Sequence, residues 1–369
     1  MTPPGEPLRL LMVTPRYLPA MGGTEQHVHE TSRRMARAGV RVTVLTTDPS
    51  GRLPSTEESD GVVVRRTRAW PRRRDLYVAP ALHREIVKGQ WDLIHIQSYH
   101  TFVAPVAMLA ALRSRVPYVL TFHGGGHSSR LRHRSRPLQR WALRPLLVRA
   151  RRLICIASFE ASDYARELRL PEELFAFIPN GMDPPSERVP EPPIPGLIAS
   201  VGRLERYKGH HRVLAAFPLV LEEVPDARLW IAGSGPYERK LRKLAAQLGV
   251  ADRVEIRAIP PERRAAMLRE LGRVSLVVLL SEFETHPMAA LEALSAGRRL
   301  MVADGFGLGE LGRRDLARIV PRDAGPAAVA AAIVEELRQP PSVPTVSPFT
   351  WDDCAAELLR LYETVRAKA

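Results

Sequence analysis

Short apolar runs alternate with helical segments along most of the chain, and this alternation constrains the possible fold more than any other feature. The apolar runs have the length and composition of buried strands, and in the first half they lie at residues 8–14, 40–48, 91–98, 116–124 and 151–158. Helical periodicity separates them, for example over residues 24–38, where Gly39 ends the pattern. Strands that alternate with helices indicate a parallel, doubly wound sheet.

A proline-rich segment divides the chain into two parts. Residues 184–196 contain six prolines in thirteen positions, which is typical of a linker. The strand–helix pattern then starts again, so we predict an N-terminal domain over 1–183 and a second α/β domain over 197–350. Residues 351–369 are predicted to form an amphipathic helix. This helix either stays with the C-terminal domain or crosses back to the N-terminal domain. Ligands of open α/β sheets bind at the carboxyl ends of the strands, so the two sheets are expected to face a central cleft.

The bulk composition excludes several classes of protein. A hydrophobic content of 45% and a charged content of 25% are those of a globular protein. Cys155 and Cys354 lie in different halves, so no disulfide framework is predicted and a reducing, cytoplasmic compartment is expected. We expect no signal peptide, because Arg9 interrupts the only apolar run near the N-terminus. No stretch approaches the ~20 apolar residues of a membrane-spanning helix.

Positive charge is concentrated in the first half of the chain. The net charge is +14, and residues 1–185 hold 28 Lys and Arg against 16 Asp and Glu, which leaves +12 there and +2 in the rest. Only five of the 54 basic residues are lysines, a bias that a GC-rich genome would produce. Codon bias does not explain the asymmetry between the halves, which suggests an anionic partner such as a nucleic acid or a membrane.

Two segments, 65–74 and 128–152, contain most of these arginines. The second segment also carries apolar residues between its basic ones, namely Leu138, Trp141, Leu143, Leu146, Leu147 and Val148. A basic amphipathic helix with Trp and Leu is typical of a membrane-surface element, here at the inner face of the plasma membrane. An ordinary helix with its apolar side in the core explains the pattern equally well, and Pro145 is expected to interrupt the helix.

Several motifs, taken in order, resemble the retaining glycosyltransferases of family 4, which have the two-domain GT-B fold. The motifs are GGTEQHVHETSRRMARAGVRVTVLTT, FHGGG, FIPNGMD, VGRLERYKG, IAGSGP and SEFETHPMAALEALSAG, and they cover nearly the whole chain. The combination of Arg203 and Lys208 with two glutamates eight positions apart, Glu284 and Glu292, is the specific part of the resemblance. Either pair alone would be weak.

The resemblance implies a role for each residue that matches a family motif. It implies that Arg203 and Lys208 hold the diphosphate of a nucleotide-sugar donor and that Glu292 binds its ribose. Glu284 would lie at the hydroxyl groups of the sugar, and His123 would face the transferred sugar. Both are the candidate catalytic residues.

Three further residues complete the implied site. Gly22 and Gly23 resemble the N-terminal loop that closes over the phosphates, and Arg257 loosely resembles the position whose backbone frames the base. The chain departs from the common pattern after Glu284, where Thr-His-Pro replaces Gly-Phe-Gly. We expect the sugar contacts at this point to differ from the common pattern, including any made by His286.

Elementary chemistry supports the same arrangement. A nucleoside diphosphate gains negative charge as it leaves, and cations and helix N-termini can compensate for that charge without a metal ion. Arg203 offers a planar fork to phosphate oxygens and Lys208 a point charge. Pro287 is suited to the first turn of a helix, so the N–H groups of Met288 and Ala289 are predicted to face the diphosphate.

The sequence therefore predicts a metal-independent, retaining glycosyltransferase of the hexosyltransferase type, without a cofactor. UDP is the first candidate for the base of the sugar donor, and a GDP-sugar enzyme with a soluble acceptor is the alternative. The acceptor hydroxyl could belong to a lipid-linked sugar or a polysaccharide. A basic nucleic-acid-binding protein is the rival from another class, but the basic runs have little aromatic interleaving and no nucleic-acid module, so no nucleic acid is expected. A relative that binds sugar nucleotides without catalysis is disfavoured by the complete motif set.

Overall fold

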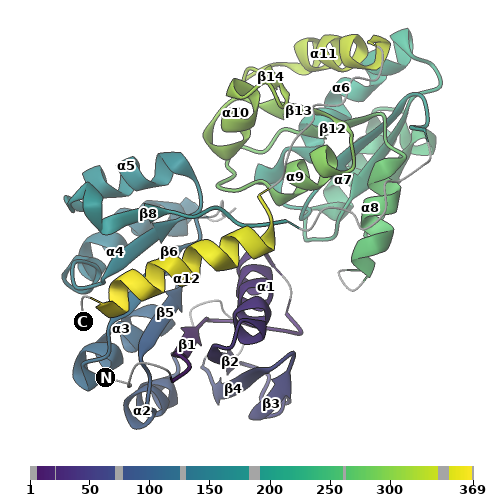
Figure 1. Ribbon diagram of the computed structural model, residues 1–369. Coiled ribbons are helices and arrows are strands. Elements are labelled where there is room, and N and C mark those ends of the chain that lie inside the picture. The colour runs from purple at the N-terminus through teal and green to yellow at the C-terminus, as the bar shows by residue number, and fades with distance from the viewer. Residues whose placement is uncertain are drawn as a thin grey trace. The chain divides into compact units, whose positions relative to one another are not determined.

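The computed structural model describes residues 6–20, 22–70, 78–124, 130–182, 192–260, 263–339 and 349–367. They form two compact domains (Figure 1). The N-terminal domain contains the described residues up to Gly124, then Leu131–Gly181, and then the chain again from Phe349. The C-terminal domain begins at Met182 and includes the described residues between 192 and 339.

The N-terminal domain is built on one sheet with the strand order β3-β4-β2-β1-β5-β6-β7-β8. All neighbouring strands are parallel except β3 and β4, which form an antiparallel hairpin. The strands are β1 (Arg9–Val13), β2 (Arg41–Asp48), β3 (Thr56–Ser59), β4 (Val62–Arg68), β5 (Leu93–Gln97), β6 (Tyr118–Phe122), β7 (Arg152–Cys155) and β8 (Phe175–Phe177).

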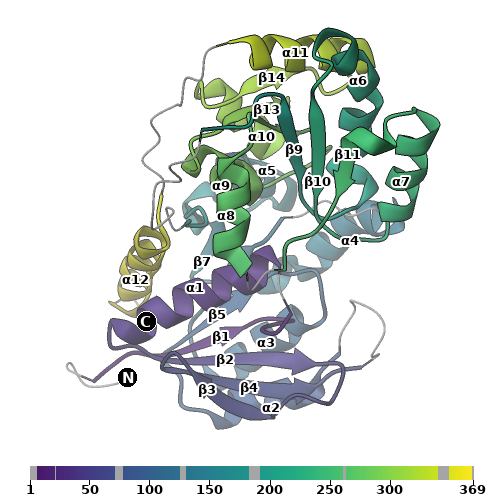
Figure 2. The same cartoon turned by 90° about the vertical axis from the view of Figure 1, so that its right-hand side faces the viewer.

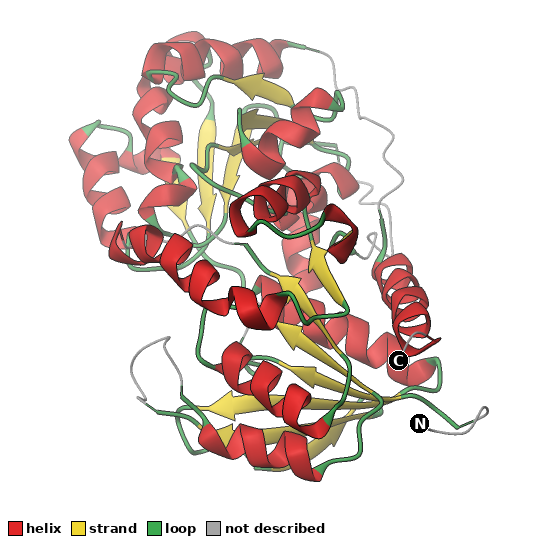
Figure 3. Cartoon of the chain, turned by 90° about the vertical axis from the view of Figure 1, so that its left-hand side faces the viewer, coloured by secondary structure: helices red, strands yellow, loops and turns green. Residues whose placement is uncertain are grey.

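Helices cover both faces of this sheet (Figures 2 and 3). One face packs in a single hydrophobic core with α2 (Pro80–Lys88), α3 (Val103–Ser114), α4 (Arg130–Leu147) and α5 (Ser158–Leu168). On the other face lie α1 (Gly23–Arg37) and the last helix of the chain, α12 (Trp351–Ala367). Both faces of the central strands are therefore buried, which explains their nearly continuous apolar sequences.

Helix α12 is held in the N-terminal domain by buried contacts. His95 on β5 links the Tyr362 hydroxyl of α12, 2.6 Å from Nδ1, to the Thr121 hydroxyl, 2.7 Å from Nε2. Near the start of the helix, a Cβ added to Gly181 would lie only 2.3 Å from the backbone nitrogen of Trp351. Only glycine allows the segment before Met182 to touch the beginning of α12 so closely.

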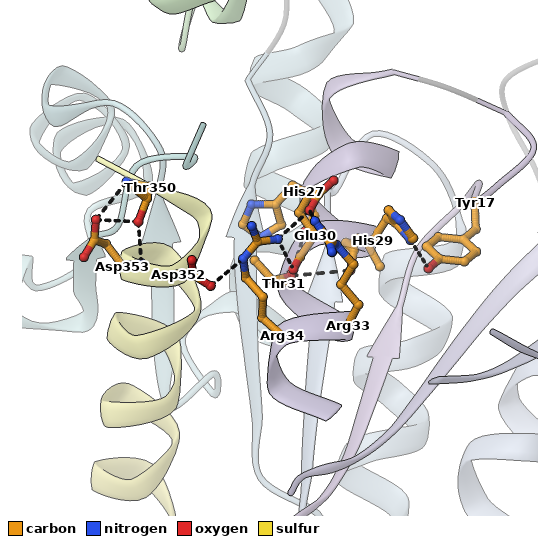
Figure 4. Close-up of polar contacts among 11 residues, drawn as sticks. Tyr17, His27, His29, Glu30, Thr31, Arg33, Arg34, Thr350, Asp352 and Asp353 are labelled. Carbon is orange, nitrogen blue, oxygen red and sulfur yellow. Dashed lines mark hydrogen bonds and ion pairs between the residues drawn. The ribbon is translucent and has the colours of Figure 1, made fainter. Parts of the chain in front are cut away.

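A polar network joins α12 to α1 (Figure 4). The Arg34 guanidinium donates to Asp352 at 2.8 Å and to Glu30 at 2.5 Å. Thr350 and Asp353 form a reciprocal capping box, in which the Asp353 N–H donates to the Thr350 hydroxyl at 3.1 Å and the Thr350 N–H donates to the carboxylate at 2.9 Å. The helix therefore begins at a fixed point against α1.

The C-terminal domain has a wholly parallel sheet with the order β11-β10-β9-β12-β13-β14. Its strands are β9 (Leu197–Val201), β10 (Arg228–Ala232), β11 (Val254–Ile256), β12 (Leu276–Leu279), β13 (Arg299–Ala303) and β14 (Arg318–Val320). Hydrophobic cores lie on both faces. The helices are α6 (His210–Glu223), α7 (Glu238–Gln247), α8 (Arg264–Gly272), α9 (Met288–Ser295), α10 (Phe306–Arg313) and α11 (Pro326–Arg338).

Two local expectations were wrong or incomplete. Pro145 does not interrupt α4, which continues to Leu147: the proline removes one backbone hydrogen bond, but the Val148 N–H still donates to the Arg144 carbonyl at 3.0 Å. The hairpin of β3 and β4 was not foreseen, since its edge strand Thr56–Ser59 has no apolar alternation. None of the described helices is both long and apolar enough to cross a bilayer.

Candidate active site

Three of the predicted phosphate and sugar residues, Arg203, Lys208 and Glu284, meet at one place on the C-terminal sheet. Strands β9 and β12 are parallel neighbours, and the chain continues from them towards opposite edges of the sheet. Such a topological switch point opens a crevice at the carboxyl ends of the strands, where ligands of α/β folds bind. The loop after β9 carries Arg203 and Lys208, and the loop after β12 carries Glu284.

Backbone contacts hold these two loops against each other. Gly209 has a φ of +74°, and a Cβ added to it would lie 2.0 Å from the Leu280 carbonyl oxygen, so no other residue fits without displacing a loop. The Glu282 N–H donates to the Tyr207 carbonyl at 2.7 Å. The two loops are therefore one rigid unit, and the charged side chains they carry have a defined spacing.

Lys208 and Glu284 form an ion pair with each other. The Lys208 ammonium lies 2.5 Å from Glu284 Oε1, and the two side chains are only 16% and 19% exposed. The Ser281 hydroxyl donates to the same oxygen at 2.8 Å. The sequence placed Lys208 and Glu284 in one site but did not foresee this direct contact, and it missed Ser281.

Arg203 lies in the same loop in a more open environment. Its guanidinium donates to the Tyr207 hydroxyl at 3.0 Å and lies 3.1 Å from Glu205 Oε1, with 66% of the side chain exposed. The Tyr207 ring is also 5.4 Å from the Lys208 ammonium. Tyr207 thus contacts both predicted phosphate ligands, although its sequence position between them gave no chemical signal.

His210 is buried against this loop and holds its backbone through hydrogen bonds. It is 1% exposed, its Nδ1 lies 2.8 Å from the Ser200 hydroxyl, and its Nε2 lies 3.2 Å from the Arg203 carbonyl oxygen. Burial lowers the pKa of His210 to about 4, so the ring is neutral at neutral pH. A neutral ring can accept a hydrogen bond from the Ser200 hydroxyl at Nδ1 and donate one to the Arg203 carbonyl from Nε2. This bond anchors the backbone of Arg203.

The N-terminus of α9 differs in detail from the prediction. Pro287 is the N-cap residue, one position before the helix, and the Met288 N–H donates to the His286 carbonyl at 3.0 Å. The Met288 N–H therefore has a backbone partner in this structure, and its role at a diphosphate, like that of Ala289, stays a prediction. Ala289 is half-buried in the first turn.

The two glutamates lie at different levels of this segment. The backbone carbonyl of Glu284 accepts from the Gly307 N–H at 2.9 Å, which fixes its loop against the start of α10. Glu292 is half-buried inside α9, about one turn after the helix begins. Its role at the ribose stays a prediction.

Arg257 follows β11 and is exposed. Its backbone N–H donates to the Ile231 carbonyl at 3.1 Å, and its own carbonyl accepts from the Trp230 indole at 3.2 Å. The guanidinium lies 5.2 Å from the Trp230 ring. Because these backbone groups already have partners in the domain, the match to a base-framing position gains no further support.

His123 belongs to a buried cluster of histidines in the N-terminal domain. It follows β6, and its Nε2 lies 2.7 Å from Gln97 Oε1, so Nε2 carries the proton and Nδ1 is the acceptor. The His27 ring lies edge-on at 5.0 Å, and His100 Nε2 is 2.9 Å from the His123 carbonyl oxygen. Burial, together with the neighbouring His27, His95 and His100, holds the pKa of His123 well below its usual value.

Gly22 and Gly23 lie at the N-terminus of α1, with Gly22 as the N-cap residue in extended conformation. A Cβ at Gly22 would lie 2.5 Å from Glu25 Oε2, and the same carboxylate accepts from Arg16 at 3.1 Å. The loop predicted to close over phosphates thus has a carboxylate beside it. Among the residues that the structure describes, no three His, Cys, Asp or Glu side chains converge as metal ligands would.

Each half of the chain matches a known protein family. Residues 21–185 match the family Glycosyltransferase Family 4, and residues 186–342 match Glycosyl transferases group 1. The chain is 29% identical to the glycogen synthase of Mycobacterium tuberculosis, over 96% of this chain and 94% of that protein.

Two other similarities extend over the whole chain. The GDP-mannose:cellobiosyl-diphosphopolyprenol alpha-mannosyltransferase of Komagataeibacter xylinus is 27% identical over 99% of this chain and 95% of its own. The solved structure of sucrose-phosphate synthase from Thermosynechococcus elongatus superposes with a TM-score of 0.75 at 19% identity, covering 98% of this chain and 100% of that one. The two-domain architecture is therefore the GT-B fold.

The buried histidines predict how stability depends on pH. His95, His123 and His210 have pKa values lowered chiefly by burial, so the folded chain stays neutral at these rings while the unfolded chain takes up protons below about pH 6.5. The free energy of unfolding should therefore be highest above pH 6.5 and should fall by up to about 1.4 kcal/mol per histidine for each pH unit below it.

Urea unfolding between pH 7.5 and 5.5 measures this loss, and NMR of the imidazole nitrogens identifies the rings responsible. The expected spectra show these three rings neutral at pH 5.5. Equal stability across the range, or protonated rings in the folded protein at pH 5.5, would contradict the assignment.

Proposed function

Because the chain belongs to the glycosyltransferases that join a family 4 half to a group 1 half, we propose that it transfers a sugar from a nucleoside diphosphate donor to an acceptor hydroxyl with retention of configuration. The observation that carries the proposal is the convergence of Arg203, Lys208 and Glu284 at the switch point of the C-terminal sheet. Two cations and one carboxylate on rigid loops suit a substrate with a charged and a hydroxylated part.

The reaction needs charge compensation at the leaving phosphate. In the proposed mechanism Arg203 and Lys208 bind the diphosphate as its bond to the anomeric carbon breaks. The departing phosphate oxygen takes the proton of the acceptor hydroxyl on the same face of the sugar, so configuration is retained without a separate base. The proposal includes no metal ion or cofactor.

The identity of the base and the sugar is a finer part of the proposal. UDP remains the first candidate from the sequence, and the GDP-mannose named for the Komagataeibacter relative makes GDP the alternative. A thermal-shift screen against UDP, GDP, ADP and their sugar conjugates, with oligonucleotides in parallel, distinguishes them. Stabilisation by one diphosphate and by no oligonucleotide is expected.

Removing either cation should weaken binding of the sugar donor. Lys208→Ala and Arg203→Ala each delete a charge-assisted contact worth roughly 1.5–3 kcal/mol, or about tenfold to a hundredfold in affinity. Arg206→Ala is the matched control, because Arg206 is a 66% exposed cation in the same turn whose distance to Glu282 is 3.9 Å. Titration calorimetry provides the affinities, and NMR of the product's anomeric proton reports the configuration.

Unchanged affinity in both variants, or a product of inverted configuration, would refute the proposal. Stabilisation by oligonucleotides alone would favour the nucleic-acid-binding alternative.

We further propose that the acceptor is presented at an anionic membrane surface. Helix α4 places Leu143 and Leu147 in the core, whereas Leu138 and Trp141 are 68% and 71% exposed on the opposite side, with Val148 continuing the same stripe. Residues 101–150 contain nine arginines and no acidic residue. The Komagataeibacter relative is named for a polyprenol-linked acceptor, which supports a lipid-linked acceptor for this chain.

The exposed stripe gives a test of membrane binding. Leu138→Ser combined with Trp141→Ser should lower the affinity for acidic vesicles, measured by sedimentation, about tenfold or more. The reason is that the two apolar side chains which would be buried among lipids are lost. Phe177→Ser is the matched control, because Phe177 is 51% exposed on the edge strand β8 of the same domain. Equal binding to neutral and acidic vesicles, or none to either at low salt, would contradict the proposal and indicate a soluble acceptor.

A further inference from the structure

The ion pair between Lys208 and Glu284 joins two side chains that the proposed function assigns to different parts of the sugar donor. Lys208 is assigned to the diphosphate and Glu284 to the sugar, yet their charged atoms lie 2.5 Å apart. The Ser281 hydroxyl gives Glu284 Oε1 a second hydrogen bond at 2.8 Å. In this arrangement the carboxylate is the counter-ion of the lysine.

A bound diphosphate would change the balance of charge at this point. An ammonium has three N–H groups and could contact phosphate and Glu284 together, but the phosphate and the carboxylate would then be two anions a few ångströms apart. At a partly buried site such repulsion is on the order of a few kcal/mol. The carboxylate is therefore expected to leave Lys208 when a phosphate arrives.

The loops themselves cannot relieve this repulsion. The backbone of Gly209 touches the Leu280 carbonyl, and the Glu282 N–H is bonded to Tyr207 at 2.7 Å, so the loops cannot separate without breaking these contacts. Rotation of the Glu284 side chain remains as the means of adjustment. Displaced from Lys208 and Ser281, the carboxylate then needs new hydrogen-bond donors.

We propose that the Lys208–Glu284 pair makes the protein select the intact nucleotide-sugar over the bare nucleoside diphosphate, with Ser281 as the positioning residue that holds the pair. The hydroxyl groups of the sugar can receive the displaced carboxylate, because a carboxylate accepts two hydrogen bonds from a diol. A bare diphosphate displaces Glu284 and gives it no new partner. The pair thus disfavours the product, which assists its release.

Arg203, the second cation, is not coupled in this way to a residue assigned to the sugar. Arg203 lies 3.1 Å from Glu205, whose side chain is only 16% exposed, but 66% of the arginine side chain is exposed, so water can take the place of the carboxylate at the guanidinium at little cost. Only the less exposed pair carries the selectivity, and Glu205→Gln is therefore the matched control for Glu284→Gln.

Titration calorimetry with UDP and UDP-glucose, and with GDP and GDP-mannose, tests the proposal, which rests on the proposed function. Glu284→Gln should bind the bare diphosphate about threefold to tenfold more tightly than the unmodified protein, because the phosphate no longer has to displace a charged carboxylate from Lys208. Its affinity for the nucleotide-sugar should not increase, since the carboxylate contact with the hydroxyls is also lost. The preference for the sugar conjugate therefore falls.

Ser281→Ala provides an independent test that leaves both charges in place. It should tighten binding of the bare diphosphate, as Glu284→Gln does, but by less. Ser281→Thr, which keeps the hydroxyl, should restore the affinity of the unmodified protein. Glu205→Gln should leave both affinities within about twofold.

Each contrary result has a distinct meaning. If the unmodified protein binds none of these nucleotides and is not stabilised by ADP or its sugar conjugates either, the proposed function and this inference are both overturned. If it binds them, but Glu284→Gln and Ser281→Ala bind the bare diphosphate no more tightly, only the selectivity is overturned. Equal tightening of both ligands in Glu284→Gln would also contradict it, because the pair would then oppose phosphate without favouring the sugar.

Discussion

The contact between Gly209 and the Leu280 carbonyl is the constraint on which the candidate site depends. A Cβ at this glycine would lie 2.0 Å from the oxygen, and its φ of +74° is unfavourable for other residues. The contact joins the loop after β9 to the loop after β12 at the switch point of the sheet. The spacing of Lys208 from Glu284 follows from it, and with that spacing comes the ion pair between them.

A similar close approach of backbones organises the N-terminal domain. Gly181 allows the chain to touch the start of α12, and the helix then buries Tyr362 against His95. The C-terminal segment is therefore part of the domain that contains the buried histidines. Because His123 belongs to that cluster, stays neutral and gives its Nε2 proton to Gln97, the ring can accept a hydrogen bond at Nδ1 but carries no positive charge.

Much of this architecture could be predicted from the sequence, for identifiable physical reasons. Strands buried on both faces produce apolar runs, so the central strands of both sheets were recognisable. The edge hairpin at Thr56–Arg68 was missed because an exposed edge strand needs no apolar face. Arg203, Lys208 and Glu284 were singled out because the motifs that contain them resemble those of family 4 glycosyltransferases, and the charge of a diphosphate and the hydroxyls of a sugar give such residues a chemical reason to lie in loops after strands.

The details that escaped prediction depend on side-chain and backbone geometry rather than residue type. The direct bond between Lys208 and Glu284 requires two loops that are 76 positions apart in sequence to touch. The engaged Met288 N–H depends on where α9 begins, and helix boundaries shift by one or two residues without a change in pattern. Ser281 is a common loop residue, and only its position beside both charges gives it a role.

The central claim is that a nucleotide diphosphate binds at the carboxyl end of the C-terminal sheet, between Arg203 and Lys208. A crystal structure of the protein with a bound nucleoside diphosphate sugar measures this most directly. The account predicts phosphate oxygens within hydrogen-bonding distance of the Lys208 ammonium and the Arg203 guanidinium, with Glu284 turned to the sugar hydroxyls. A nucleotide bound elsewhere, or phosphates that leave the Lys208–Glu284 pair intact, would contradict it.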